Sequence, residues 1–355
     1  MKNLLVLFGG KSNEHEVSLL SAVNVCNNVD KSRYNLIKVG ITKNGTWKLY
    51  TGEVEKLPNG LWEKDIENQK PVTISTNTEM RALIVFDTKS TTYELIPIDV
   101  AFPVLHGRNG EDGTIQGLLT VGGIPFVGCD TYSSAVCMNK AATKILSEQN
   151  GVKSTPYVVV SKNDKDKAIE LVDSKNLEYP VFVKPQSGGS SVGITKVKMP
   201  SELNAALDFA FENDCDGIAL IEQGVIGKEI EVALLGDEEG LIVSPCGEIE
   251  PGSEFYDYDN KYNDDTAKYY APARIDDAIA EKVRQLGCTV FRSCGCRGLA
   301  RCDFFVTDKG EILLNEINTI PGFTQISMYS KLLSLAGIST EKIIDTLVEI
   351  ALKRA

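Results

Sequence analysis

The chain has 355 residues, of which 43% are hydrophobic and 24% charged, with 30 glycines and 13 prolines. This composition excludes a disordered, collagenous or coiled-coil chain, and the length predicts two or three globular domains. The net charge of −12 makes the surface as a whole repel nucleic acids and anionic lipid, so neither is expected as a partner.

The first part of the chain predicts a layered α/β domain. Apolar residues 4–8 end at Gly9-Gly10 and predict a buried parallel strand, followed by a helix over residues 17–25 and a strand over 35–42. Residues 54–92 are weakly patterned, which favours hairpins and loops. In such an order of strand, turn and helix, ligands gather at the carboxyl ends of the strands. A further buried strand, 100–105, delivers His106 there.

The hydrophobic pattern changes near residue 130. Helical periodicity over 133–149 predicts a helix that ends at Asn150-Gly151. The elements predicted after it are a strand at 157–160, a helix at 164–174, strands at 181–184 and 194–197, a helix at 200–212, and strands at 218–222 and 229–235. The remainder predicts a polar loop (253–270), a helix (276–294), a hairpin, and an amphipathic helix with Ser339 as its N-cap. We therefore expect domains at 1–129, 130–227 and 228–355.

Nine cysteines are scattered, odd in number and without a CxxC pair, so we interpret them as free core thiols rather than a disulfide framework or a metal site. The apolar N-terminal run is too short for a signal peptide or a membrane span. We expect a cytoplasmic protein without a membrane partner.

The most informative local pattern is a predicted hairpin around Asp308-Lys309-Gly310. A loop of two or four residues places Asp303 across from Glu316 and Arg301 across from Asn318, with all four side chains on one face. Two carboxylates and an amide oxygen there suit Mg²⁺. The alternative is a solvated face with a cross-strand arginine–carboxylate pair, and a three-residue loop with a bulge would separate Asp303 from Glu316.

A glycine- and serine-rich loop follows Lys184 and can direct backbone N–H groups at phosphates, although it is not a P-loop. Such a loop alone is more often a turn, but Lys184 and Lys140 favour a triphosphate. Glu222 could accept a hydrogen bond from an adenine amino group and Glu229 could bind a ribose hydroxyl. Each is equally compatible with an ordinary acid at the end of a strand.

A third pattern is the acidic segment that precedes the first helix. Glu14 can be favourable only to the helix dipole, or the helix N-terminus and Glu14 together can hold the carboxylate and ammonium of a zwitterion. His106, in a glycine-rich loop after a strand, is well placed for a site, although a lone histidine is more often structural.

These segments together resemble the D-alanine–D-alanine ligases of the ATP-grasp superfamily along nearly the whole chain. The segments that carry the resemblance are GGKSNEHEVS near residue 9, LHGRNGEDGTIQG from 105, MNKAATK from 138, VKPQSGGSSVGITKV from 183, EFYDYDNKY from 254 and NEINTIPGFTQISM from 315. The implied fold, α/β and α+β, has a Rossmann-like N-terminal parallel sheet (1–129), a central ATP-binding lobe (130–227) and a C-terminal ATP-grasp catalytic lobe (228–355).

The resemblance implies roles for individual residues. ATP is implied to contact Lys140, Lys184, Ser190, Ser191, Glu222, Glu229 and Lys261. Two Mg²⁺ or Mn²⁺ ions are implied at Asp303, Glu316 and Asn318. The substrate residues implied are Glu14 and His106 for the first D-alanine and Ser327 and Met328 for the second. The catalytic residues implied are Glu14, Ser190, Tyr262, Arg301, Gly322 and Ser327. Of these, Arg301 and the Gly322 N–H are implied to stabilise an oxyanion, and Tyr262 to hydrogen-bond to Ser190 and through it to Glu14.

The implied activity is ATP-dependent ligation of two D-alanines through an acyl phosphate, supplying peptidoglycan precursors, by a homodimer whose loop 253–270 closes over the site. The alternatives are a D-alanyl-D-lactate or D-alanyl-D-serine ligase of the glycopeptide-resistance type, an ATP-grasp ligase with other substrates, or a catalytically silent nucleotide-binding protein. Tyr262 and Met328 favour the dipeptide, because the lactate type tends to have a histidine in the loop and the serine type an arginine after the serine. Asn139 departs from the family's usual aspartate, and we expect it to affect helix packing more than chemistry.

Overall fold

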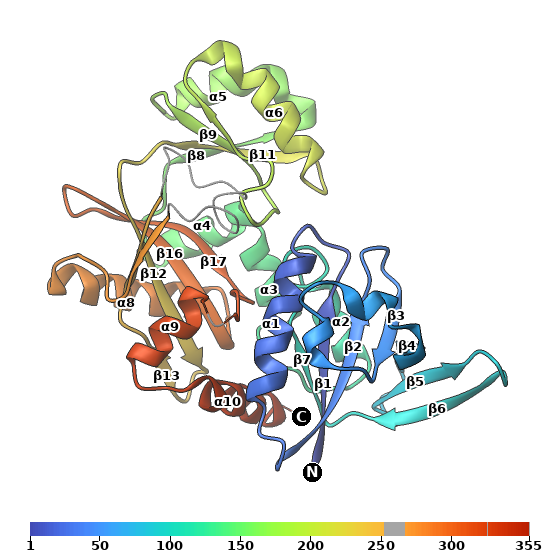
Figure 1. Ribbon diagram of the computed structural model, residues 1–355. Helices are drawn as coiled ribbons and strands as arrows, with labels where there is room; N and C mark the ends of the chain where they lie inside the picture. The colour runs from blue at the N-terminus through green and yellow to red at the C-terminus, as the bar shows by residue number, and fades with distance from the viewer. Residues whose placement is uncertain (252–266, 325, 355) are drawn as a thin grey trace.

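The computed structural model describes residues 1–251, 267–324 and 326–354, which form three sheets with helices packed around them (Figure 1). Lys261 and Tyr262 lie outside the described residues. Among the described residues, no helix is long and apolar enough to cross a lipid bilayer. All nine cysteines are free thiols, as predicted.

The N-terminal sheet has seven strands in the order β6-β5-β4-β3-β2-β1-β7. Its parallel part is limited to β1 (Lys2–Gly9), β2 (Tyr34–Ile41) and β7 (Val100–Pro103), and it carries α1 (His15–Asn28) and α2 (Thr114–Val121). The weakly patterned segment forms short 3₁₀ helices and the antiparallel strands β4 (Gln69–Ile74) and β5 (Ala82–Asp87). The strands β3 (Trp47–Tyr50) and β6 (Thr92–Pro97), also antiparallel to their neighbours, flank it. The sheet is therefore mixed rather than wholly parallel.

The central sheet is antiparallel, in the order β10-β9-β11-β8. Its elements are β8 (Tyr157–Ser161), α5 (Ala168–Ser174), β9 (Val181–Pro185), β10 (Thr195–Val197), α6 (Leu203–Glu212) and β11 (Ile218–Gln223). Both predicted helices begin with a 3₁₀ turn, so α5 starts later than residue 164 and α6 later than residue 200. The two helices lie on one side of this sheet (Figure 1).

The helix predicted over residues 133–149 is wrong as a single element. The structure has α3 (Thr131–Met138) and α4 (Lys140–Gln149), separated at Asn139, whose φ of −85° and ψ of 101° are not helical. The Asn139 side chain accepts a hydrogen bond from Ala142 N at 3.0 Å and so caps α4. Apolar periodicity continues across the break, which is why the pattern alone did not reveal it. The break makes Lys140 the first residue of a helix.

The C-terminal sheet follows the order β15-β14-β12-β16-β17, with β13 paired to β12. Its strands are β12 (Gly227–Gly236), β13 (Leu241–Val243), β14 (Gly247–Glu250), β15 (Lys268–Tyr270), β16 (Gly298–Thr307) and β17 (Ile312–Asn318). Helices α8 (Asp277–Ser293), α9 (Met328–Leu335) and α10 (Thr340–Leu352) pack on it. Ser339 caps α10 as predicted, accepting from Lys342 N at 3.2 Å.

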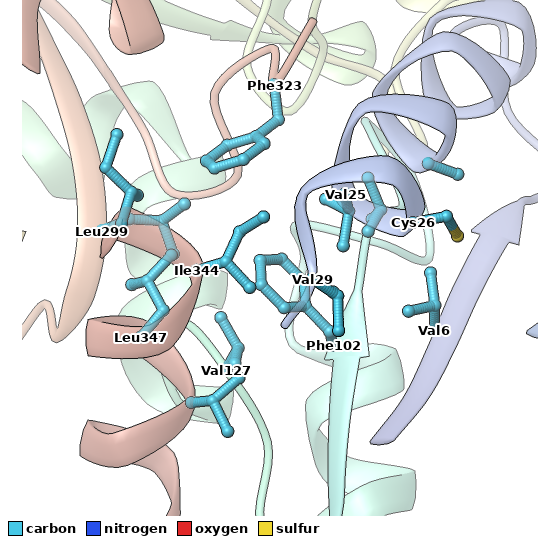
Figure 2. Packing of buried hydrophobic residues seen from close by; sticks show 14 of the residues in the cluster. Val6, Val25, Cys26, Val29, Phe102, Val127, Leu299, Phe323, Ile344 and Leu347 are labelled. Atoms are coloured by element: carbon cyan, nitrogen blue, oxygen red, sulfur yellow. The ribbon is translucent and has the colours of Figure 1, made fainter. Parts of the chain in front are cut away.

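One hydrophobic cluster joins the N-terminal sheet to the C-terminal part of the chain (Figure 2). Val25 of α1 and Phe102 of β7 lie in this cluster together with Phe323 and with Ile344 of α10. The Phe102 and Phe323 rings meet edge to face, with centroids 6.1 Å apart. The segment before α9 is thereby fixed against the N-terminal sheet. This contact places residues from the two ends of the chain, such as Val25 and Phe323, next to each other.

Candidate active site

The β16–β17 hairpin places Asp303 across from Glu316 and Arg301 across from Asn318, as predicted. Residues 308–311 separate the two strands, but Thr307 N donates to Glu311 O at 2.9 Å, so only three residues, 308–310, form the turn and the predicted loop length is wrong. The expected separation of Asp303 from Glu316 is avoided because the register shifts again between Asp303 and Phe304, where Asn315 is the extra residue on β17. Two irregularities therefore compensate each other, and the predicted pairing is confirmed.

The polar face of this hairpin carries a dense set of charges. Arg301 donates from Nε and Nη2 to the two Asp303 oxygens, both at 2.7 Å, and its Nε lies 3.2 Å from Glu231 Oε1. Asn318 Nδ2 donates to Asp303 Oδ2 at 2.9 Å. Burial opposes the charge of Arg301, but the Asp303 and Glu231 carboxylates raise its pKa well above the ordinary value. We call Glu231, Arg301, Asp303, Glu316 and Asn318 the hairpin cluster.

The donor chemistry of the hairpin cluster fits a hard divalent cation. Asp303, Glu316 and Asn318 offer carboxylate and amide oxygens on the face opposite the buried side chains of Cys302 and Ile317. No group of three or more histidine, cysteine, aspartate or glutamate side chains within the described residues is arranged to hold a metal. The predicted set has only two such residues and an amide, so it stays a prediction.

The loop after β9 folds back onto the start of α1. Ser190 Oγ donates to Glu14 Oε1, and Gly189 lies so close that an added Cβ would sit 2.9 Å from Glu14 Oε2. Ser190 and Ser191 both have positive φ, 51° and 59°, a strained conformation for residues with side chains. The predicted contact between the serine loop and Glu14 is confirmed. Its continuation to Tyr262 lies outside the described residues.

An unpredicted residue, Asp214, anchors the first residues of this loop. Its Oδ2 accepts from Ser187 N at 2.8 Å, while its Oδ1 accepts from the backbone N–H groups of Asp216 and Ile218. Asp214 is buried and ties the loop to the beginning of β11. A short acidic side chain before a strand carries little signal in the sequence, since most such residues are solvated turns.

Lys140 connects the serine loop with the hairpin cluster. Its Nζ donates to the Gly188 carbonyl and lies 3.8 Å from Glu316 Oε2, and its backbone N–H donates to Gln186 O at 3.1 Å. A small cavity of about 40 Å³ lies between these groups. Its polar lining includes Glu14, Glu111, Lys140, Ser190, Glu316 and Asn318. Residues that are far apart in the sequence therefore meet in one place.

A second charged group lies at the ends of β9 and β11. Lys184 Nζ is 2.7 Å from Glu222 Oε2 and also donates to Asn315 Oδ1 at 3.3 Å. Lys144 Nζ is 3.2 Å from the other Glu222 oxygen. Burial alone would raise the pKa of Glu222, but the two lysines lower it below its ordinary value. We call Lys144, Thr155, Lys184 and Glu222 the strand-end cluster.

Two family models match the chain, the D-ala D-ala ligase N-terminus over residues 3–129 and the D-ala D-ala ligase C-terminus over residues 146–349. The chain belongs to the D-alanine–D-alanine ligase family. Curated relatives named D-alanine–D-alanine ligase include those of Caldicellulosiruptor bescii, 45% identical over 98% of this chain and 94% of the relative, and Clostridium acetobutylicum, 44% identical over 99% and 98%.

Solved structures of the family superpose over almost the full length. The VanG D-Ala:D-Ser ligase from Enterococcus faecalis is 41% identical, with a TM-score of 0.90 and 99% of both chains covered. The D-alanine–D-alanine ligase from Coxiella burnetii is 32% identical, with a TM-score of 0.84, 99% of this chain and 94% of that chain covered. These relatives support the ATP-grasp fold predicted from the sequence motifs.

Within this family fold, His106 joins helix α1 to the segment that precedes Gly322. It is buried; Nδ1 donates to the Ile320 carbonyl at 2.9 Å, and Nε2 lies 3.0 Å from Ser21 Oγ. Burial lowers the pKa of His106, so the ring is neutral and Nε2 accepts from the Ser21 hydroxyl. Ser21 Oγ in turn accepts from Phe323 N at 3.2 Å. With both nitrogens engaged, His106 orders the backbone on both sides of Gly322, and its position near the first D-alanine stays a prediction.

Glu111 is a site residue that the sequence reasoning missed. Its two oxygens accept from Gly107 N at 2.9 Å and from Ile320 N at 2.8 Å, so it joins the loop after β7 to the segment before Gly322. Burial, with the nearby Glu14 charge, raises the pKa of Glu111 to about 8. The matched segment LHGRNGEDG contained Glu111, but nothing in its spacing distinguished it from a loop carboxylate.

The segment before and at the start of α9 carries the two residues predicted to bind the second substrate, Ser327 and Met328. Ser327 Oγ accepts from Thr324 N at 3.0 Å, and an added Cβ on Gly322 would sit 3.0 Å from it. Ser327 and Gly322 are therefore adjacent. The Met328 side chain is buried in the hydrophobic core, so its predicted role is restricted to its backbone N–H at the start of α9. Glu229 pairs with Phe305 in the sheet, and its ribose role stays a prediction.

Proposed function

We propose that this chain is an ATP-dependent ligase that joins two D-alanines into D-alanyl-D-alanine through an acyl phosphate and supplies peptidoglycan precursor synthesis. The observation that carries this proposal is the contact of Ser190 with Glu14. It puts the phosphate-loop candidate directly beside the acid that would hold the first amino acid's ammonium. A carboxylate bound next to Glu14 would then lie close to the γ-phosphate that it must attack.

The residues divide the work of two steps. In the first step, the substrate carboxylate attacks the γ-phosphorus and ADP leaves, while Lys140 and Lys184 offset the phosphate charge. In the second step, the amine of the other D-alanine attacks the acyl carbon and phosphate leaves. Arg301 and the Gly322 N–H would stabilise the oxyanion of the tetrahedral intermediate that forms after the amine attacks and before phosphate leaves. Asp303 accepts from Nε and Nη2 of Arg301 and so fixes the guanidinium plane, which would let the remaining nitrogen, Nη1, serve the oxyanion.

Asp303, Glu316 and Asn318 would hold Mg²⁺ or Mn²⁺, and two ions are proposed. When bound, these cations would neutralise charge on the transferring phosphoryl group. Glu222 and Glu229 would contact the adenosine, with Ser191 and Lys261 at the phosphates. Ser327 and the Met328 N–H would bind the second carboxylate. The predicted loop 253–270 is wrong at its end, because residues 268–270 form β15; the remaining part, 253–267 with Tyr262, would close the site and exclude water from the acyl phosphate.

Three further parts of the proposal concern organisation. Apart from Gly227, the first residue of β12, the three sheets fall within ranges 1–129, 130–227 and 228–355, which supports these as domains. The β5–β6 hairpin exposes Phe86, Tyr93 and Leu95 and extends from the N-terminal sheet (Figure 1), which supports a homodimer that covers it. The use of ATP is consistent with the cytoplasm.

A D-alanyl-D-serine ligase is the second candidate, favoured by the TM-score of 0.90 with the VanG D-Ala:D-Ser ligase. Met328, which follows Ser327, favours D-alanine instead. The test is phosphate release from ATP with D-alanine alone and with D-alanine plus D-serine or D-lactate, with each product identified by mass. We expect D-alanyl-D-alanine as the main product. A mixed product that exceeds the dipeptide at equal concentrations would favour the second candidate, and phosphate release that ignores D-alanine would exclude both.

A further inference from the structure

The strand-end cluster contains a lysine to which neither the motifs nor the proposed mechanism gives a role. Lys144 lies one turn after Lys140 on α4, and its side chain is 0% exposed. Its Nζ donates to Thr155 Oγ1 at 2.5 Å and lies 3.2 Å from Glu222 Oε1. A buried ammonium is costly unless it is paired and hydrogen-bonded, so a lysine at this place calls for a compensating function.

Glu222 has two positive partners, one on each carboxylate oxygen. Lys184 Nζ lies 2.7 Å from Oε2, and Thr155 Oγ1 donates to the same oxygen at 2.9 Å. Lys144 is the partner of Oε1, which, within the described part of the chain, receives no hydrogen bond of good geometry. Two lysines against one carboxylate leave this buried cluster with an excess of one positive charge.

The proposed mechanism sets Lys184 and Glu222 in competition. Lys184 is required at the phosphates of ATP, yet its nearest charged partner in this structure is Glu222. If Lys184 moves to the phosphates, a buried carboxylate would be left without a positive partner unless a second cation stays. Breaking a buried ion pair by removing one partner is strongly unfavourable. Lys144 has no exposed side-chain surface and is held by Thr155 and Glu222, so we expect it to stay.

We propose that Lys144 is a positioning residue, the fixed counter-ion that keeps Glu222 anionic and oriented and thereby frees Lys184 to bind the ATP phosphates. This inference rests on the proposed function, since it takes ATP as the ligand of Lys184. Thr155 helps Lys144 to hold Glu222 in place, because its hydroxyl accepts from Lys144 and donates to Glu222. Burial lowers the pKa of Lys144 to about 8, which leaves it mostly protonated at neutral pH.

The test uses steady-state kinetics of the full chain with ATP as the varied substrate. In Lys144→Met the release of Lys184 from Glu222 becomes unfavourable, so the KM for ATP should rise about tenfold while kcat at saturating ATP changes less than about threefold. Lys153→Met is the matched control. Lys153 lies in the segment just after α4, its side chain is 70% exposed and pairs only with Glu311 among the described residues, and we expect it to leave both constants unchanged.

A double-mutant cycle separates this role from a merely structural one. In the Glu222→Gln background the carboxylate that needs a counter-ion is absent, so adding Lys144→Met should change the KM for ATP less than about twofold. An equal rise in both backgrounds would overturn the proposal, as would an unchanged KM in Lys144→Met. If Lys144→Met does not fold, Thr155→Val gives the decision: it keeps the shape, removes the shared hydroxyl and should raise the KM about threefold. An unchanged KM there would overturn the proposal.

The outcome can be distinguished from failure of the proposed function. D-alanine-dependent phosphate release by the unaltered chain tests the ligase itself. If that activity is present and Glu222→Gln raises the KM for ATP while Lys144→Met does not, only the role of Lys144 is contradicted. If the unaltered chain shows no such release, the ligase assignment fails before Lys144 is tested.

Discussion

The hairpin cluster and the strand-end cluster are both largely buried, but their charges have opposite signs. The hairpin cluster has three carboxylates, Glu231, Asp303 and Glu316, against the single guanidinium of Arg301. The strand-end cluster has two lysines against Glu222. Asn315 and Glu316 are neighbours on β17 and connect the two clusters, since Asn315 accepts from Lys184 while Glu316 faces Lys140.

The difference indicates which ligand charge each cluster takes. Buried charge imbalance is unfavourable, so each cluster is best balanced by a ligand of the opposite sign. The negative hairpin cluster suits a cation and the positive strand-end cluster suits phosphate oxygens. A nucleotide with its metal, lying across β17, would neutralise both at once. Changing the charge of either cluster therefore tests this comparison, and the effects should differ in kind.

The largest effect is expected for Asp303→Asn. The change keeps the volume, removes a negative charge from the proposed metal site and weakens the hold on Arg301, so turnover should fall at least about 100-fold. The measurement is kcat at saturating D-alanine, ATP and Mg²⁺, with circular dichroism to confirm the fold. Asp308→Asn in the hairpin loop is the control and should retain full turnover. Activity that survives in Asp303→Asn would remove this residue from the ligand set.

Lys184→Ala should act on ATP binding rather than on the chemical step alone. It removes the positive charge that we assign to the phosphates, so the KM for ATP should rise about tenfold or more, whereas the KM for D-alanine should change little. Varying ATP and D-alanine separately measures the two constants, with Lys153→Ala as the exposed control. An unchanged KM for ATP would mean that the loop after β9 is only a structural turn.

The fold could be predicted from the sequence where two independent constraints agreed. For the hairpin, the alternation of polar and apolar residues on both strands fixed which residues face each other. That is why Asp303 meets Glu316 although the loop is one residue different from the expected lengths. Leu314 stays in the core because the extra residue, Asn315, takes up the shift.

The helix break and the buried charges could not be predicted from the sequence. Asn139 interrupts a segment whose apolar period continues, and only the direction of the chain after it shows the break. Glu111 and Glu231 are surrounded by partners distant in sequence, Ile320 and Arg301, so no local pattern marks them. Lys144 fits the polar face of a helix as well as a core position. Their roles depend on tertiary packing, which the sequence alone does not show.

Glu111 lines the same cavity as Glu316 of the negatively charged hairpin cluster. Glu111→Gln tests this negative region through the pH dependence of the free energy of unfolding. Glu111 ionises near pH 4.5 in the unfolded chain and near pH 8 in the folded one, so between these values the folded state binds one more proton. Its contribution to the free energy of unfolding is therefore full below pH 4.5 and lost as the pH rises to 8. Glu111→Gln does not show this pH-dependent loss of stability, because glutamine does not ionise.

The free energy of unfolding, measured by urea at several pH values, should show the difference between unaltered chain and variant. That difference should fall by up to about 2 kcal/mol from pH 4.5 to 8. The fall is smaller than the full pKa shift implies, because Glu111 is only partly buried and solvent screens its charge. A constant offset is expected in addition, because glutamine replaces one of the two accepting oxygens. Glu94 is exposed on β6 and serves as the control. For Glu94→Gln, the difference in the free energy of unfolding should stay constant from pH 4.5 to 8. A pH-independent difference in Glu111→Gln would contradict the raised pKa.

The smallest effect concerns Asn139, which holds Lys140 at the start of α4 between the two clusters. Its side chain accepts from Ala142 N, so Asn139→Ala should lower the free energy of unfolding by about 1 kcal/mol, the usual cost of losing an N-cap. Asn139→Asp keeps the acceptor and adds a negative charge at a helix N-terminus, which should stabilise by roughly 0.3–1 kcal/mol. If Asn139 acted mainly through helix packing, as expected from the sequence, alanine and aspartate would both destabilise. Urea unfolding of the two variants separates these cases, with Gln149→Ala at the exposed end of the same helix as the control. A higher KM for ATP in Asn139→Ala but not in Asn139→Asp would show in addition that the cap positions Lys140 for its contacts with Gly188 and Glu316.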